Sequence, residues 1–321
     1  MKDYEYKSSL SDEIKDFIKV RSNQGFKDKN IHIIQSLDRY LADSNIETKD
    51  LSEDIITGWL KTKSDEISSS TMDKYICFCN NFAEYLIKLG HQAFITERPL
   101  YMDSYVPYIF TEEETASLFA GADNMQFGNN RSRFQFPMLL RILYGCGLRL
   151  GEALSLRLDD INIEEGILYI KNAKNNRDRL VPVDETLRTI LEAYCKKLKF
   201  DYSTNPLLFE NETGNIREQC WARHLFRKLL CSLGYERTAL KAHERGICLH
   251  CLRHTFAVSS LRQQEKNGID SYDVAPLLSV YMGHAHLLET LRYLHMTTEN
   301  AADILETVSQ YVTGIFPEVP S

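Results

Sequence analysis

An arginine placed just after a glycine break is the first feature that suggests chemistry. The segment Arg141-Ile-Leu-Tyr-Gly-Cys-Gly-Leu-Arg149-Leu-Gly-Glu152 puts Arg149 at the start of an expected helix. A guanidinium group and the amides at a helix N-terminus both donate hydrogen bonds to phosphate oxygens. Arg149 is therefore a candidate phosphate ligand, although most single arginines are simply exposed or paired.

Two later segments supply an acid–base group, a second arginine and a nucleophile. His250 and Arg253 stand three residues apart at the start of an expected helix, which places both on one face. Gly283-His284 is followed nine residues after the histidine by Tyr293. Each of these residues alone would usually be structural. Together with Arg149 they offer two phosphate ligands, histidines for proton transfer and a phenol for attack.

These segments, in this order, resemble the catalytic boxes of the tyrosine recombinase (integrase) family. The first-arginine box is matched by Gly147-Leu-Arg149-Leu-Gly-Glu152 and the histidine-to-arginine box by His250-Cys-Leu-Arg253-His254. The tyrosine box is matched by Gly283-His284 through Tyr293. A chance match of all these boxes across about residues 108–296 is improbable.

The family also has a lysine on a β-hairpin, and one run of this chain is similar to that hairpin. The run is Lys174-Asn-Asn-Arg-Asp-Arg179-Leu-Val-Pro182, a lysine followed by a basic turn and a Val-Pro strand. The resemblance therefore implies Lys174 as the catalytic lysine. Lys171 is the alternative, and either one would otherwise be an ordinary solvated lysine.

The resemblance implies a phosphoryl transfer without a metal or any other cofactor. Such a transfer needs charge stabilisation on the phosphate oxygens, an in-line nucleophile and a proton for the leaving oxygen. Arg149 and Arg253 would hold the scissile phosphate, and His284 would add a hydrogen bond to it.

Proton transfer would fall to the remaining members of the implied set. Tyr293 would attack, and because a phenol has a pKa of about 10, a base must remove its proton, with His250 as the candidate. Lys174 would protonate the departing 5′-hydroxyl. The product would be a 3′-phosphotyrosine, so the implied function is a site-specific DNA recombinase that cleaves and rejoins DNA in integration, excision or resolution.

Members of the family exchange strands as tetramers on DNA, so double-stranded DNA and further copies of the chain are the implied partners. An accessory recombinase or directionality factor is a further partner to consider, and no membrane partner is expected. The range 299–315 reads as an amphipathic helix that would dock on a neighbouring subunit or pack on its own domain. The sequence leaves this choice, the target DNA and the biological task open.

The elements that must position these residues predict a mainly α fold with a small β-sheet, in two domains. Residues 1–93 are expected to form a helical bundle, a core-type DNA-binding domain, with helices at 12–21, 31–45, 52–62 and 70–89. Residues 94–108, punctuated by Pro99 and Pro107, are expected to form the interdomain linker. Residues 109–321 would form a mixed α/β catalytic domain with a C-terminal helix.

Within the catalytic domain, Thr111 followed by Glu114 is a capping-box pattern that opens a helix to about residue 122. A strand pair is predicted at 167–170 and 179–183, joined by a polar turn. Helices are predicted at 134–144, 150–158, 185–198, 217–233, 250–264, 274–282, 287–293 and 299–315.

Bulk composition fits two globular domains. The 321 residues are 43% hydrophobic and 26% charged, with no long apolar run and no export signal, so a cytoplasmic, nucleoid-associated protein is expected. The net charge of −7 argues against a nucleic-acid partner, but binding depends on local surface, and residues 171–188 include five basic side chains, Lys171, Lys174, Arg177, Arg179 and Arg188. The length leaves no room for an extra arm-binding domain, which favours an Xer-like or transposon-type enzyme.

The eight cysteines are expected to be reduced and mostly core residues. Cys248 and Cys251 form a CxxC with His243, His250 and His254 nearby, so a zinc site is an alternative interpretation. The absence of a second CxxC makes it the weaker one, and no metal is expected.

Two alternatives to a recombinase also stand. One is a catalytically inactive DNA-binding or architectural protein, against which the complete set of candidate catalytic residues argues. The other is a monomeric topoisomerase-like nickase, which only the motif order and the two-domain layout disfavour.

Overall fold

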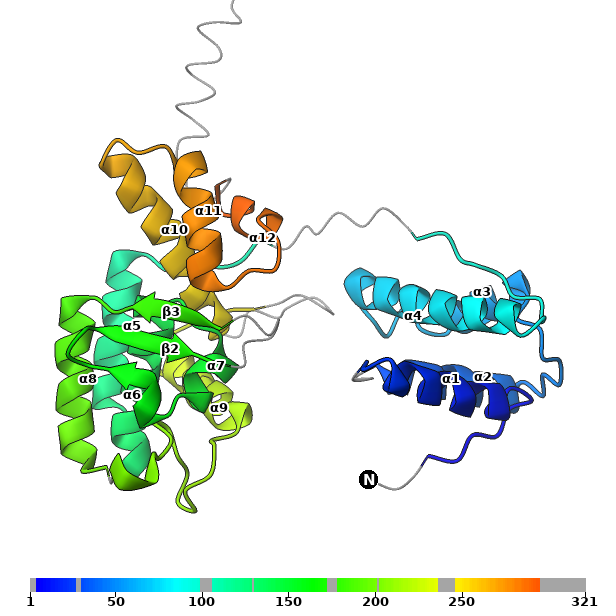
Figure 1. The fold of residues 1–321 in the computed structure, drawn as a ribbon, viewed down its shortest axis with the longest axis horizontal. Helices are drawn as coiled ribbons and strands as arrows, with labels where there is room; N and C mark the ends of the chain where they lie inside the picture. Colours follow the sequence, from blue (N-terminus) through cyan, green and yellow to red (C-terminus); the bar gives the residue numbers. More distant parts are fainter. Residues whose placement is uncertain are drawn as a thin grey trace, which may run out of the picture. The chain divides into compact units, whose positions relative to one another are not determined.

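The computed structural model describes residues 4–26, 30–98, 106–128, 130–171, 178–200, 202–235 and 246–294. The described residues form two compact units that divide at residues 105 and 106 (Figure 1). The fold is mainly helical with one small antiparallel sheet, which confirms the predicted fold class. Lys174, Arg177 and the expected helix 299–315 lie outside the described residues.

The N-terminal unit contains the four predicted helices, and each end lies within two residues of its prediction. They are α1 (Ser11–Asn23), α2 (Ile31–Asp43), α3 (Glu53–Lys61) and α4 (Ser69–Lys88). The side chains of Ser52 and Ser68 accept hydrogen bonds from the first turns of α3 and α4, which sets where these helices begin. Helical periodicity and serine caps together therefore account for the element boundaries.

One buried carboxylate ties the first residues of the chain to this unit. Asp38 on α2 is 1% exposed and accepts hydrogen bonds from the Ser8 amide (3.0 Å), the Ser8 hydroxyl (2.6 Å) and the Tyr4 hydroxyl (3.0 Å). These donors compensate for the loss of hydration. The aromatic side chains of Phe17, Trp59 and Phe82 fill the core around it.

The second unit, from residue 106 onward, is called the catalytic unit because it carries the candidate catalytic residues, and it is built mostly of helices packed around a central one. Its elements are α5 (Glu112–Asn124), α6 (Asn130–Gly145), α7 (Leu150–Ser155), η1 (Leu158–Asp160), β1 (Ile161–Asn162), β2 (Ile167–Ile170), β3 (Arg179–Pro182), α8 (Glu185–Leu198), η2 (Tyr202–Thr204), α9 (Gln219–Ser232), α10 (His250–Lys266), α11 (Ser271–Met282) and α12 (Leu288–Leu291). Helix α6 packs on α5, α7, α8 and α10. The segment around Arg149 and the start of α10 therefore lie on one core, whereas Tyr293 packs in a second cluster with Ala257 and Met282.

The start of α5 and the strand pair form as the sequence predicts. The Thr111 side chain accepts from the Glu114 amide, and the Glu114 carboxylate accepts from the Thr111 amide, which confirms the capping box. Strands β2 and β3 pair in antiparallel register, with Leu168 opposite Val181. Both of these residues are buried, so this face of the sheet lies on the core.

Several boundaries differ from the predictions, and among them α6 begins four residues earlier, at Asn130, and α7 ends three residues earlier, at Ser155. Strand β1, only two residues long, pairs with β2 and was not predicted, because so short a segment has no periodicity. Helix α11 starts at Ser271, three residues earlier than predicted, because the Asp270 carboxylate caps it by accepting from the Tyr272 amide. Helix α12 covers only Leu288–Leu291 and ends before Tyr293.

The loop between α6 and α7 depends on one glycine. Gly147 has φ +59°, a left-handed conformation that side chains disfavour. A Cβ atom there would also collide with the ring of Phe256, which stacks on Tyr281 at a ring-centroid distance of 5.4 Å. This position thus requires glycine for both backbone and packing reasons, and the loop leads directly into Arg149.

We expect Gly147→Ala to lower the free energy of unfolding by about 2–4 kcal/mol, the sum of left-handed strain and overpacking. Urea denaturation of the purified protein would measure it. Gly214→Ala is the matched control, because Gly214 has φ +76° but open space around it, so it should lose only about 1 kcal/mol. Equal losses for both variants would contradict a packing role for the Gly147 position.

Candidate active site

Arg253 is a fully buried cation at the centre of the site. It is 1% exposed on α10, and its guanidinium donates to the carbonyl of Gly147 and to that of Met282, the latter at 2.8 Å. Burial, and next the charge of Arg149, lower the pKa of Arg253 to about 10, so it stays protonated at neutral pH. The α6–α7 loop and the end of α11 therefore meet at one guanidinium.

Arg149 lies beside it and is positioned by neighbours at both ends. Its guanidinium donates to the Glu152 carboxylate and to the Gly283 carbonyl, each at 3.0 Å. Its amide donates to the other Glu152 oxygen at 3.0 Å, so this amide is already occupied, contrary to the expected use of helix amides at Arg149 for an anion. The side chain of Arg149 is 21% exposed, so a ligand can still reach the guanidinium.

Glu152 holds a second arginine that the motif comparison did not assign. Arg179 at the start of β3 donates to both oxygens of Glu152, at 2.8 and 3.2 Å, and to the Tyr281 carbonyl at 2.8 Å. Burial acts to raise the pKa of Glu152, but the hydrogen bonds from Arg179 and Arg149 outweigh it and lower that pKa. Two guanidinium groups thus bind one carboxylate, and the charge of Arg253 acts on the same place, which leaves a positive field suited to phosphate.

Tyr293 is buried next to this cluster, and its hydroxyl contacts a histidine. It is 5% exposed, and its Oη lies 2.8 Å from Nδ1 of His254. Burial raises the pKa of Tyr293, while the charge of Arg253 acts against this effect. His250, the sequence-predicted base, is exposed at the start of α10, and its ring centroid lies 4.5 Å from that of His254.

His284 shares a threonine with the tyrosine. Its Nδ1 lies 2.6 Å from Oγ1 of Thr290, and the Thr290 carbonyl accepts from the Tyr293 amide at 2.9 Å. The rings of His284 and Tyr293 stack with centroids 6.3 Å apart. Thr290 is fully buried and therefore orients both candidate residues from α12.

Both the half-buried His254 and the buried His284 are neutral at physiological pH. Burial, followed by the charges of His250 and Arg253, lowers the pKa of His254 to about 3. Burial, followed by the charges of Arg253 and Arg149, lowers the pKa of His284 to about 3 as well. A neutral imidazole keeps one nitrogen as a hydrogen-bond acceptor, which the phenol of Tyr293 can use as a donor.

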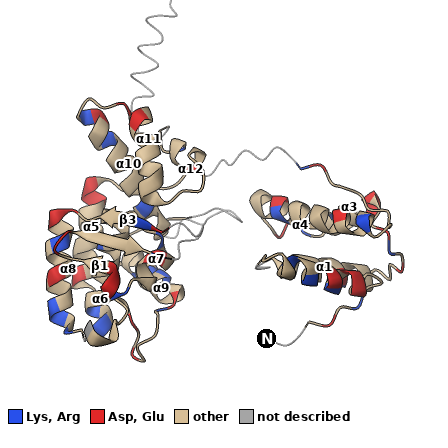
Figure 2. Cartoon of the chain, viewed as in Figure 1, with Lys and Arg blue, Asp and Glu red and all other residues tan. Residues whose placement is uncertain are grey.

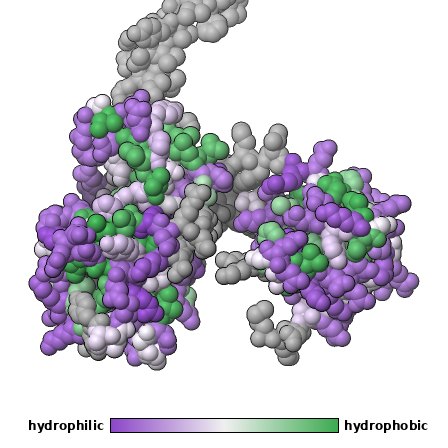
Figure 3. All heavy atoms as spheres, in the orientation of Figure 1, coloured by the Kyte–Doolittle hydropathy of each residue, from purple (hydrophilic) through white to green (hydrophobic). Residues whose placement is uncertain are grey.

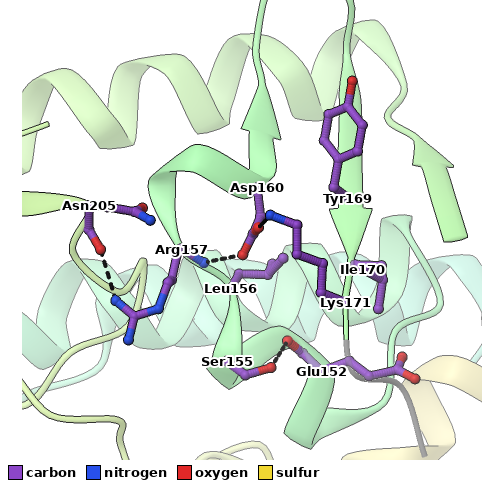
Figure 4. A pocket seen from close by; sticks show the side chains of 9 residues that line it. All are labelled: Glu152, Ser155, Leu156, Arg157, Asp160, Tyr169, Ile170, Lys171 and Asn205. Carbon is purple, nitrogen blue, oxygen red and sulfur yellow. Dashed lines mark hydrogen bonds and ion pairs between the residues drawn. The ribbon is translucent and has the colours of Figure 1, made fainter. Parts of the chain in front are cut away.

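The expected basic stretch around the hairpin is largely neutralised where it is described. Lys171, the alternative to Lys174, pairs with Asp160 at 2.6 Å, and Arg188 pairs with Glu185 at 2.6 Å. Lys171 and Asp160 line a cavity of about 300 Å³ that Glu152 also lines, and Figure 4 shows the lysine amine turned toward Asp160. The Lys171 amine is therefore held by Asp160 and not by Tyr293, and Lys174 lies outside the described residues.

The structure thus brings Arg149, Arg253, His284 and Tyr293 together, with His250 joined to them through His254. The residue types and their spacing in the sequence did not indicate the roles of His254, Arg179 and Thr290. The available signal for His254 was its place four residues after His250, on the same helix face. Among the described residues, no group of three or more histidine, cysteine or acidic side chains could hold a metal ion.

Comparison with known proteins places the chain in a family. The phage integrase family matches residues 109–300, more than half of the chain, so the chain belongs to this family, the tyrosine recombinases. Tyrosine recombinase XerA of Pyrococcus horikoshii is 28% identical over 201 residues, which are 63% of this chain and 61% of that relative. The alignment therefore leaves more than a third of that relative unmatched.

Solved structures share the fold at lower identity. A crystal structure of XerH site-specific recombinase bound to palindromic difH substrate, a post-cleavage complex, matches with a TM-score of 0.68 at 19% identity, covering 95% of this chain and 85% of that one. A lambda integrase tetramer bound to a Holliday junction matches with a TM-score of 0.62 at 16% identity, covering 86% and 77%. In the described part of this chain, no helix has the length and apolar character needed to cross a membrane.

We expect the free energy of unfolding to fall at acid pH because of His254 and His284. An unfolded histidine binds a proton below about pH 6.5, whereas His254 and His284 do so in the folded state only near pH 3. The unfolded state therefore binds more protons in this window, and stability falls as the pH drops, by up to about 1.4 kcal/mol per pH unit for each histidine.

Urea denaturation of wild type and His254→Gln between pH 7 and pH 4 would measure this effect. The free energy of unfolding of the variant should fall less steeply as the pH drops, because one of the two histidines no longer contributes. His224→Gln, at an exposed position of α9, is the matched control and should follow the wild type. Identical slopes for wild type and His254→Gln would show that His254 is not buried as a neutral group.

Proposed function

We propose that this chain is a site-specific DNA recombinase that cleaves and rejoins DNA through a 3′-phosphotyrosine intermediate. The observation that carries the proposal is a buried tyrosine whose hydroxyl contacts a neutral histidine beside a cluster of guanidinium groups. Family membership supports the same function, as does the fold shared with a recombinase captured after cleavage. The proposed catalytic set is Arg149, Lys174, His250, Arg253, His284 and Tyr293.

In the proposed reaction, Arg149 and Arg253 bind the two non-bridging oxygens of the scissile phosphate. Both side chains are already fixed by backbone carbonyls, so little reorganisation is needed as negative charge develops. Arg149 is partly exposed and would meet the phosphate first, while Arg253 supplies charge from within the core. His284, oriented by Thr290, adds a hydrogen bond to the phosphate.

The nucleophile loses its proton as it attacks. The Tyr293 oxygen forms a bond to phosphorus, and its proton passes to Nδ1 of His254, the group in direct contact with it. The low pKa of His254 reflects burial and neighbouring positive charge, and a bound phosphate would offset that charge. His250, in contact with the His254 ring, then acts through this second histidine rather than on the phenol directly.

The leaving group is the 5′-oxygen of the next nucleotide, which we assign Lys174 to protonate. Lys171 is the less suitable donor, because its amine is held by Asp160. The phosphotyrosine bond then conserves the energy of the phosphodiester, so a 5′-hydroxyl from another strand can attack it and restore intact DNA. A protein that works on chromosomal DNA in this way would act at the nucleoid.

DNA binding in this proposal rests on local surfaces of both units rather than on the total charge. Figure 2 shows basic and acidic residues interspersed over α5, α6 and α8, in keeping with the net charge of −7. The positive field is instead concentrated where Arg149 and Arg179 share the Glu152 carboxylate close to the buried Arg253. The helical N-terminal unit is proposed to supply a second DNA contact.

We expect Tyr293→Phe to abolish covalent attachment to DNA while leaving DNA binding unchanged. The test is a nicked substrate that traps the phosphotyrosine adduct, resolved on a denaturing gel, with binding measured separately by gel shift. His254→Gln should slow adduct formation by about 10²-fold, the usual contribution of a general base. An adduct that still forms with Tyr293→Phe would disprove the assigned nucleophile.

A matched variant separates base catalysis from general damage to the fold. His224→Gln changes an exposed histidine of α9 and should keep the wild-type rate of adduct formation. Wild-type protein that binds DNA but forms no adduct would favour the alternative of a catalytically inactive DNA-binding protein. An unchanged rate of adduct formation in His254→Gln would indicate that His250, and not His254, is the base.

Assembly of several subunits on DNA is also part of the proposal. Helices α11 and α12 expose large apolar side chains, with Leu277 and Val280 each 73% exposed and Leu288 72% exposed. Figure 3 shows apolar residues gathered where these helices lie. Exposed apolar patches of this kind are typical of protein interfaces, and the matching lambda integrase structure is a tetramer on DNA.

We expect Val280→Asp to raise the protein concentration needed for tetramers on DNA about tenfold, equivalent to about 1.4 kcal/mol of assembly free energy. Native gels with one-site and two-site DNA would measure it, and binding of a single subunit should be unchanged. Ile216→Asp is the matched control, since Ile216 is 49% exposed and precedes α9, away from α11. Normal assembly of Val280→Asp would exclude this face as the interface.

A further inference from the structure

Two cysteines at the start of α10 lie close enough to react with each other. The Sγ atoms of Cys248 and Cys251 are 3.9 Å apart, and the Cys248 amide donates to the Cys251 sulfur at 3.4 Å. Cys248 is exposed, whereas Cys251 is fully buried. This combination of an accessible and a buried thiol in a CxxC at a helix N-terminus is typical of redox-active dithiols.

The dithiol flanks the proposed catalytic residues. His250 stands between the two cysteines, and Arg253 follows two residues after Cys251 on the same helix. The backbone carbonyl of Cys251 accepts a hydrogen bond from the Thr255 hydroxyl at 2.8 Å. That hydroxyl in turn accepts a hydrogen bond from the Phe110 amide at 3.0 Å.

Cys251 is therefore fixed at a junction between α10 and the segment that leads into α5. A displacement of Cys251 bears on both α10 and the segment that leads into α5. We propose that Cys248 and Cys251 form a reversible disulfide that switches strand cleavage off. This inference rests on the proposed recombinase function, because its readout is cleavage of DNA.

The chemistry is thiol–disulfide exchange with a small disulfide such as glutathione disulfide. The Cys248 thiolate attacks the oxidant, forming a mixed disulfide and releasing one thiol. Cys251 then attacks the Cys248 sulfur and expels the second thiol. Two protein thiols are oxidised to one disulfide, the oxidant is reduced to two thiols, and a thiol reductant reverses the reaction.

The two cysteines suit these separate roles. Cys248 is reachable by an oxidant, whereas Cys251 has no exposed surface and is reachable only from Cys248. The hydrogen bond with Cys248, followed by burial, raises the pKa of Cys251, so Cys251 keeps its proton until the mixed disulfide has formed. The exposed cysteine is thus the attacking thiol and the buried one the resolving thiol.

Closing the bond requires movement next to His250. A disulfide has an S–S distance of about 2.05 Å, so the sulfurs must approach by nearly 2 Å. Cys251 is held in the core, so Cys248 and the turn that precedes His250 must move. A displacement of about 1 Å in a catalytic group can cost about 10²-fold in rate, and His250 is in contact with the His254 that binds the nucleophile.

The experiment uses the full chain in glutathione buffers of defined ratio, with two separate readouts. Mass spectrometry of peptides after alkylation detects the Cys248–Cys251 disulfide without any DNA. Adduct formation on the nicked substrate measures cleavage in the same samples. Oxidised wild type should cleave at least tenfold more slowly than reduced protein and recover fully with dithiothreitol.

Variants identify the thiols responsible. Cys248→Ser and Cys248→Ala should cleave at the wild-type rate when reduced and become insensitive to oxidation. The double variant Cys220→Ser with Cys231→Ser removes two other exposed thiols and should remain sensitive. Absence of the disulfide in oxidising buffer, or its presence with an unchanged cleavage rate, would overturn the inference. Reduced wild type that forms no adduct would instead refute the proposed function, independently of the disulfide mapping.

Discussion

The burial of Arg253 constrains the rest of the catalytic unit. A guanidinium removed from water must have hydrogen-bond acceptors, and two of those it has are the carbonyls of Gly147 and Met282. Those acceptors belong to segments more than a hundred residues apart, so three parts of the chain must converge before the charge is stabilised. Gly147 adopts a left-handed conformation where these segments converge. The carbonyl of Gly283, next after that of Met282, accepts a hydrogen bond from Arg149.

Much of the fold was predictable from local pattern. The helices of the N-terminal unit, the Thr111 capping box and the β2–β3 pair follow from periodicity, caps and turns. Strand β1 was not predictable, because two residues have no period and form a strand only by pairing with β2. Local sequence signals therefore predict elements that form through their own periodicity, caps and turns. They do not predict an element such as β1, which forms only by pairing with another strand.

The candidate site shows the same division. Arg149, Arg253, His284 and Tyr293 were found from residue type, order and spacing, and the structure brings them together. His254 was not assigned a role, because its contact joins residues 39 positions apart, and no local pattern shows that Nδ1 faces the phenol. Arg179 was counted as part of a basic surface, whereas Glu152 draws it into the interior.

Thr290 makes the positions of Tyr293, the candidate nucleophile, and His284, the candidate phosphate ligand, depend on each other. Its hydroxyl orients His284, and its carbonyl accepts from the amide of Tyr293, both within one turn of α12. A displacement of this short helix removes the tyrosine and misorients the histidine in the same step. The positions of Tyr293 and His284 are therefore coupled through one four-residue helix.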